Sequence, residues 1–139
     1  GTPFILTPSS SNTIIYGHNM KNASMFSSLL KYKDIEFWKT HRYIIFNTLT
    51  SKGIYEISIV ANEIVYYDEA KIPDGAYLFY KHSNLDSKGY FDEYVNELKK
   101  NSYFDSNISL EYGDELLTLV TCDYVQENSR LVVVAKKIN

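Results

Sequence analysis

The sequence has very little of the material from which small proteins build covalent or metal cross-links. Cys122 is its only cysteine, so the chain cannot form an internal disulfide, and a structural zinc site would need histidine or carboxylate ligands. The three histidines, His18, His41 and His82, include no pair at metal-ligand spacing. We therefore expect no metal site, and we expect Cys122 to serve either packing or chemistry.

An excess of one charge and long apolar runs are also lacking. The chain carries 14 basic and 17 acidic side chains, for a net charge of -3, whereas proteins that follow the phosphates of nucleic acids need clustered lysine and arginine. No apolar run approaches the roughly 18 to 20 residues of a membrane span. Disorder is excluded as well, because 15% of the residues are aromatic. We expect a folded domain without a nucleic-acid partner.

The 139 residues fit one domain, and alternating or β-branched segments predict that it is mainly β. In one segment, Tyr55 and Ile57 alternate with Glu56 and Ser58, as in a half-buried strand. The expected strands are Asn12 to Gly17, Arg42 to Leu49, Gly53 to Val65, Glu115 to Cys122 and Arg130 to Ile138. The second and third form one predicted hairpin, and the last two form another.

Helical spacing appears most clearly at about residues 89–103, where one apolar stripe consists of Phe91, Tyr94, Val95 and Leu98. Two shorter helical segments are expected at residues 25–30 and 34–38. Residues 68–87 are predicted to be mostly loop, with a turn at Pro73-Asp74-Gly75 and a short strand at residues 77–80.

The last hairpin places Cys122 and Arg130 at facing ends of its two arms. Opposed residues in such a pair have Cβ atoms about 5 Å apart, and alternation lets both side chains point to one face. A nucleophilic cysteine needs a thiolate, which a neighbouring cation favours. Arg130 would also be placed to donate to the oxyanion of a tetrahedral intermediate.

Each of these residues has a structural explanation too. Cys122 would pack as a small buried hydrophobe, and Arg130 would open its strand at a solvated end. His18, just past the first predicted strand, would be a loop histidine bonded to backbone. Spacing alone does not bring His18 near Cys122, so at this point both explanations stay open.

Three separated motifs resemble those of the sortase family. Thr118-Leu119-Val120-Thr121-Cys122 is similar to the TLxTC motif, and Arg130 opens a strand similar to the family's arginine-led strand. The segment from Asn12 to Met20 resembles the strand that ends in the catalytic histidine, here His18. The motifs stand in the family's order, and the resemblance covers nearly the whole chain.

Within the family, the chain resembles class B. The segments Tyr16-Gly17-His18-Asn19-Met20, Met25-Phe26 and Phe37-Trp38-Lys39-Thr40-His41 are similar to class B members, and so is a helix at about 89–103 before the cysteine strand. The resemblance implies a sortase-like closed, mainly antiparallel β-barrel with flanking helices.

The resemblance also implies a cysteine transpeptidase without cofactors. Its substrate would be the C-terminal sorting motif of a secreted protein, cleaved after threonine through an acyl-enzyme and transferred to an amine of the cell wall or of a pilin. By the same resemblance Cys122 is the nucleophile, His18 the proton donor and acceptor, and Arg130 the group that steadies the oxyanion. Substrate contacts are expected from Thr121, Asp123 and Tyr16.

Class B sortases ordinarily also carry a membrane anchor, an N-terminal helical pair and a first barrel strand ahead of the matching region. On that comparison, we expect residues 1–139 to be a catalytic domain without these parts. The native protein would be anchored at the extracellular face of the membrane of a Gram-positive bacterium, through a segment absent here.

Two alternatives remain from the sequence. One is a cysteine peptidase that releases the acyl-enzyme to water. The other is a non-catalytic β-domain that binds peptides through some of its thirteen tyrosines, with Cys122 only packing.

Overall fold

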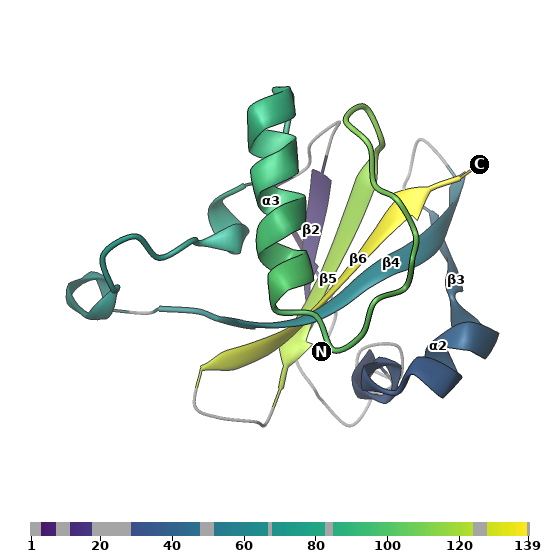
Figure 1. The fold of residues 1–139 in the computed structure, drawn as a ribbon, viewed down its shortest axis with the longest axis horizontal. Helices are drawn as coiled ribbons and strands as arrows, with labels where there is room; N and C mark the ends of the chain where they lie inside the picture. The colour runs from purple at the N-terminus through teal and green to yellow at the C-terminus, as the bar shows by residue number, and fades with distance from the viewer. Residues whose placement is uncertain are drawn as a thin grey trace.

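One six-stranded sheet forms the body of the molecule (Figure 1). The computed structural model describes residues 4–7, 12–17, 29–47, 52–66, 68–82, 85–123 and 128–138. The strand order across the sheet is β1-β2-β5-β6-β4-β3. The strands are β1 (Phe4–Thr7), β2 (Asn12–Tyr16), β3 (Tyr43–Asn47), β4 (Lys52–Ile64), β5 (Leu116–Cys122) and β6 (Ser129–Lys137).

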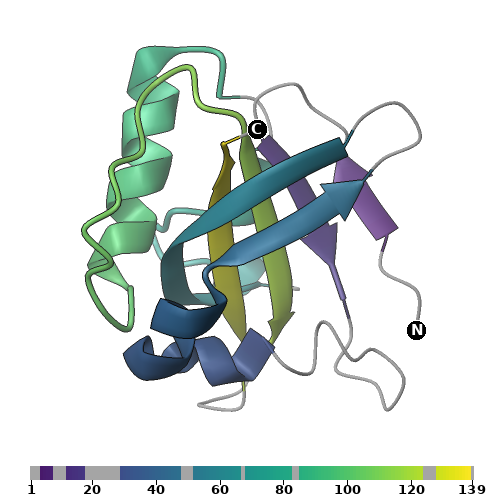
Figure 2. The same ribbon diagram turned by 90° about the vertical axis from the view of Figure 1, so that its right-hand side faces the viewer.

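The sheet curls into a half-barrel, which is easiest to see in Figure 2. In the described residues no ladder joins its edge strands β1 and β3, so the predicted closure of the barrel is not confirmed. Four of the five strand pairs are antiparallel, whereas β2 and β5 run parallel. The prediction of a mainly antiparallel sheet is therefore confirmed, with this one parallel pair as the exception. Parallel neighbours need a long crossover connection, and the chain between β2 and β5 supplies it.

Both predicted hairpins are confirmed, as β3 with β4 and β5 with β6. The predicted strand at Asn12 to Gly17 is confirmed as β2, and β1, which pairs with it, is an additional strand. The predicted strand at residues 77–80 is wrong, because Phe79–Lys81 forms a 3-10 helix, η3. Its aromatic composition suits a strand, but the Phe79 ring is fully buried in the core, and this anchors the segment without any strand partner.

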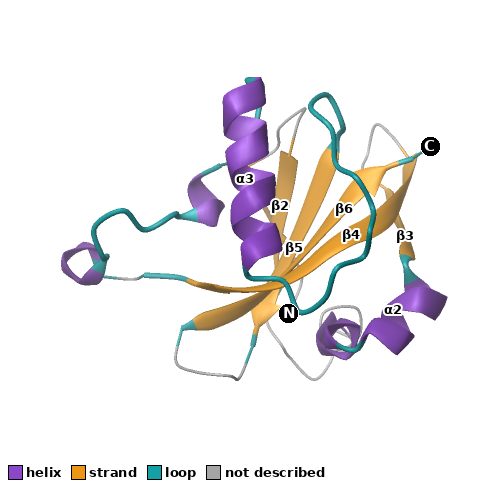
Figure 3. Cartoon of the chain, in the orientation of Figure 1, coloured by secondary structure: helices purple, strands orange, loops and turns teal. Residues whose placement is uncertain are grey.

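Helix α3 (Lys88–Lys100) covers one face of the sheet (Figures 1 and 3). Ser87 caps its N-terminus by accepting from the Tyr90 amide at 3.1 Å, and the helix ends three residues before the predicted boundary. Its predicted apolar stripe is buried against inward-facing residues of β2, β4, β5 and β6. We call this side of the sheet the α3 face. No helix in the described part of the chain is both long and apolar enough to cross a membrane.

The opposite side of the sheet packs on η1 (Leu29–Lys33) and α2 (Ile35–His41), and we call it the α2 face. Asp34 caps α2 by accepting from the Glu36 amide, and Trp38 donates its ring N–H to the Ile57 carbonyl at 2.8 Å. Strand β5 lies between the two layers, and Leu116 to Thr121 are all buried. The core therefore surrounds the strand that carries Cys122 on both faces.

Candidate active site

The last register pair between β5 and β6 joins Cys122 to Arg130, as the sequence predicts. Val120 and Val132, one alternation earlier on each strand, pack in the core of the α3 face. Since directly opposed residues of antiparallel strands share a face, Cys122 and Arg130 both point to the α3 face. Both side chains are partly exposed, so the pair lies where the buried sheet gives way to solvent.

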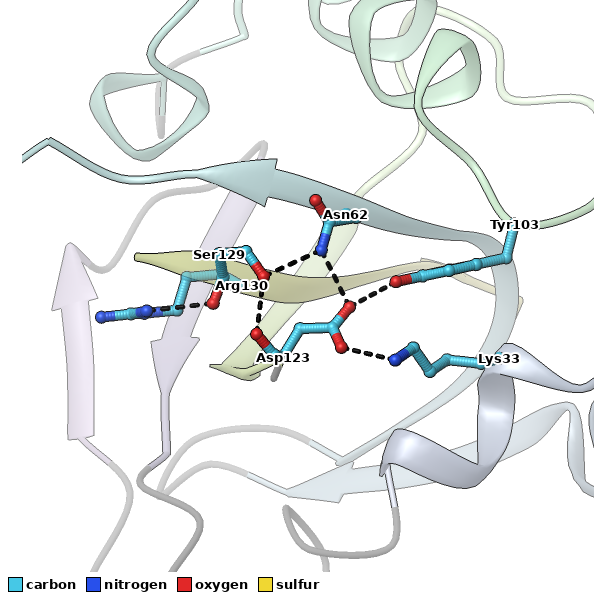
Figure 4. A network of polar contacts seen from close by, with 6 residues as sticks. All are labelled: Lys33, Asn62, Tyr103, Asp123, Ser129 and Arg130. Atoms are coloured by element: carbon cyan, nitrogen blue, oxygen red, sulfur yellow. Dashed lines mark hydrogen bonds and ion pairs between the residues drawn. The ribbon is translucent and has the colours of Figure 1, made fainter. Parts of the chain in front are cut away.

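The guanidinium of Arg130 is held close to the start of its own strand. Its Nη1 donates to the Ser129 carbonyl at 3.0 Å. In Figure 4 the side chain extends away from the carboxylate of Asp123. A guanidinium stays charged at all physiological pH values and presents several fixed donors, so it can favour a thiolate and donate to an oxyanion at this end of the sheet.

The strand that leads to the predicted histidine lies directly beside the cysteine strand. Tyr16 is the Cα partner of Val120 in the parallel pair, and the Gly17 amide donates to the Val120 carbonyl at 2.9 Å. His18 itself lies outside the described residues. Its approach to Cys122 stays a prediction.

The three residues predicted to contact substrate divide between the two faces. Tyr16 is partly buried on the α3 face, with Cys122. Thr121 is 2% exposed, and strand alternation places it on the α2 face, where its hydroxyl has no hydrogen-bond partner in the described part of the chain. The Asp123 amide donates to the Ser129 carbonyl at 3.1 Å. The Thr121 hydroxyl and the Asp123 amide, two groups from which substrate contacts are expected, are therefore not directed at the thiol.

The Asp123 carboxylate is buried among three donors that the sequence did not predict (Figure 4). Lys33 Nζ lies 2.5 Å from one oxygen, and the other accepts from Tyr103 at 2.5 Å and from Asn62 at 2.9 Å. Burial by itself would raise the pKa of Asp123, but hydrogen bonds from Lys33, Tyr103 and Asn62 lower it below its ordinary value. The only signal in the sequence was an aspartate directly after Cys122.

A second buried carboxyl group lies beside Arg130, on the strand next to β6. Glu63 of β4 is the Cα partner of Arg130, and it is 5% exposed on the α3 face. Its Oε2 accepts from Asn101 Nδ2 at 2.7 Å, and the same amide donates to Glu97 at 2.7 Å. Burial is the main cause that raises the pKa of Glu63 to about 7. The hydrogen bond from Asn101 lowers this pKa, Glu97 raises it, and Lys100 lowers it.

The described residues contain no group of three or more histidine, cysteine, aspartate or glutamate side chains placed to hold a metal ion. At the end of β5, a partly exposed thiol lies opposite the arginine that opens β6. This arrangement suits attack on a carbonyl carbon.

The family model for the sortase domain matches residues 6–138. The chain belongs to the sortase family. Sortase B of Listeria monocytogenes is 34% identical over 134 residues, which are 91% of this chain and 48% of that protein. This sortase domain thus spans about half the length of the curated relatives it matches.

Solved structures of sortase B share the fold. The X-ray structure of Clostridium perfringens sortase B matches with a TM-score of 0.77 at 30% identity, covering 100% of this chain and 74% of that chain. A Staphylococcus aureus sortase B–substrate complex matches with a TM-score of 0.76 at 26% identity, covering 100% of this chain and 62% of that chain. The predicted membership in class B is confirmed by these relatives.

We expect Glu63→Gln to stabilise this sortase domain at pH 8 by about 3 kcal/mol and at pH 5 by less than about 1 kcal/mol. The pKa of Glu63 is raised in the folded state, from 4.5 to about 7, so the folded protein binds the proton more tightly. The wild type therefore loses stability as pH rises from about 4.5 to 7. The neutral glutamine still accepts from Asn101 and does not titrate.

Urea unfolding of wild type and variant between pH 5 and pH 8 measures this difference. Glu111→Gln, at an exposed position, is the control, and it should leave the pH dependence unchanged. Parallel stability curves for wild type and Glu63→Gln would contradict the assignment.

Proposed function

We propose that this chain is the catalytic domain of a sortase transpeptidase. It cleaves the C-terminal sorting motif of a secreted protein after threonine and transfers the new acyl end to an amine of the cell wall or of a pilin. The observation that carries the proposal is the pairing of a partly exposed Cys122 with Arg130, in a chain that belongs to the sortase family.

The proposed reaction has two acyl transfers. The Cys122 thiolate attacks the carbonyl carbon of the threonine, and Arg130 donates to the resulting oxyanion. His18 gives a proton to the departing amine as the peptide C–N bond breaks, which leaves a thioester. An incoming amine then attacks the thioester, His18 takes up its proton, and the thiolate leaves as the new amide forms. The placing of His18 is part of the proposal.

The remaining predicted site residues, Tyr16, Thr121 and Asp123, lie on different faces of the sheet, and we assign them different roles. Tyr16 shares the α3 face with Cys122, and we assign it to contact with the substrate peptide. Thr121 and Asp123 are buried on the other side, so we assign them to support of the cysteine strand instead of contact with substrate. One S. aureus sortase B that matches this chain was solved as a substrate complex, which supports a peptide substrate. Membership in the family supports a place at the cell surface of a Gram-positive bacterium.

A library of candidate sorting pentapeptides, incubated with the protein in the presence and absence of triglycine, tests this function. Mass spectrometry should show one motif cleaved after threonine and, with triglycine present, a ligated product. Hydrolysis alone under excess amine would favour the peptidase that uses water. Binding of peptides without cleavage would favour the non-catalytic β-domain.

A further inference from the structure

A buried polar cluster holds the residue that follows Cys122. We call it the Asp123 cluster, and its members are Lys33, Asn62, Tyr103, Asp123 and Ser129 (Figure 4). Lys33 belongs to η1, Asn62 to β4 and Ser129 to β6, while Tyr103 follows α3. Segments from the η1 and α2 layer, from the end of the α3 layer and from strands β4 and β6 therefore meet at a single carboxylate.

The carboxylate at the centre of the cluster is closed off from solvent. The side chain of Asp123 is 0% exposed, and that of Lys33 is 32% exposed. The lysine ammonium also lies 5.2 Å from the ring centroid of Tyr103. A buried carboxylate is tolerated only where a countercharge and hydrogen bonds replace water, and here one cation and two neutral donors do so.

The same cluster reaches the backbone on both sides of the Cys122–Arg130 pair. The Ser129 carbonyl accepts from the Asp123 amide at 3.1 Å and from Arg130 Nη1 at 3.0 Å. Ser129 Oγ donates to the Asp123 carbonyl at 2.6 Å and accepts from Asn62 at 3.1 Å. Asp123, which follows Cys122, and Ser129, which precedes Arg130, are thus hydrogen-bonded to each other and to Asn62 of β4.

The Asp123 carboxylate lies on the side of the sheet opposite the thiol. Cys122 is on the α3 face, whereas Lys33, the partner of Asp123, comes from the layer on the α2 face. Figure 4 shows the Arg130 side chain and the Asp123 carboxylate extending in different directions. Asp123 therefore acts on the reacting groups through the backbone and does not touch them.

We propose that Asp123 is a positioning residue: its carboxylate, held by Lys33, Asn62 and Tyr103, fixes the ends of β5 and β6 and so sets the geometry of Cys122 relative to Arg130. Its effect on turnover rests on the proposed transpeptidation, whereas its effect on the Cys122 thiol does not. Lys33 is then the group through which the η1 and α2 layer supports the site.

The test compares Asp123→Asn and Lys33→Met with Lys33→Arg, which keeps the charge. The control is Lys39→Met, the same change at an exposed ion pair with Glu36 at 3.1 Å. Each folded variant is measured well below its melting temperature. Two experiments are made: steady-state kinetics with the cleaved peptide, which gives kcat and KM, and the rate of Cys122 alkylation by iodoacetamide as a function of pH. Asp123→Asn and Lys33→Met should each lose about tenfold to a hundredfold in kcat with little change in KM, because small misplacements of reacting groups lower the rate by this much.

In the same two variants the alkylation profile should differ from that of the wild type, because the thiol is no longer held in place beside Arg130, while Lys33→Arg and Lys39→Met stay close to wild type. Wild-type kcat and an unchanged alkylation profile in folded Asp123→Asn and Lys33→Met would overturn the proposal, even if both melt at lower temperature. Should Asp123→Asn not fold, Tyr103→Phe, which removes a single donor, takes its place with the same expected direction. If the wild type cleaves no peptide, the proposed function fails, and the alkylation profiles alone decide this inference.

Discussion

Replacing Cys122 by alanine is expected to lower kcat/KM for the sorting-motif peptide at least about a thousandfold, because the route through a thioester disappears with the sulfur. The side chain is small and partly exposed at a strand end, so the fold should be unaffected. Cleavage is followed with a fluorescence-quenched peptide, and the acyl-enzyme by intact-protein mass spectrometry. The wild type should gain the mass of the acyl fragment, and the variant should not.

The matched control is Cys122→Ser, which keeps the size of the side chain and exchanges the thiol for a much weaker nucleophile. We expect it to be nearly as inactive as the alanine variant, with a wild-type melting curve. Full cleavage by Cys122→Ala would show that the thiol is not the nucleophile, and the proposed function would then be wrong.

The second large effect is expected at Arg130. Arg130→Ala should lower kcat by about 10² to 10³, which corresponds to about 3 to 4 kcal/mol, the usual cost of losing one donor to an oxyanion. Arg130→Lys should recover only part of the loss, since an ammonium cannot present the paired donors of a guanidinium. Steady-state kinetics with the same quenched peptide separates kcat from KM.

A control on the same strand is Lys136→Ala. Lys136 shares the α3 face of β6 but lies at the far end of the ladder, opposite Leu116. Its loss removes the same charge from the same strand, and kcat should stay within about twofold of wild type. A raised KM with wild-type kcat in Arg130→Ala would limit the arginine to binding the ground state.

The part of the site that follows from local pattern was predictable. Two apolar segments separated by a short linker predict a hairpin, and its register then follows from the alternation, so the facing of Cys122 and Arg130 could be derived from the sequence alone. The apolar stripe of α3 was predictable for the same reason, since a helical period is a local property.

The parts that depend on distant contacts were not predictable. The partners of Asp123 come from positions 33, 62 and 103, which are far apart in the sequence, and no local pattern brings them together. The parallel direction of β2 against β5 depends on how the crossover packs, which strand propensity does not encode. The misassigned strand at residues 77–80 shows the same limit, because the burial of Phe79 overrides its propensity.

The parallel pair of β2 and β5 also fixes when the site can be assembled during folding. β5 and β6 form a local hairpin, but β2 meets β5 only after about a hundred intervening residues have been brought into a closed loop, which costs entropy before any contact repays it. A ribosome makes β2 before it makes the hairpin. β2, whose C-terminal end leads to His18, therefore cannot pair with β5 until the long crossover and β5 itself have been synthesised.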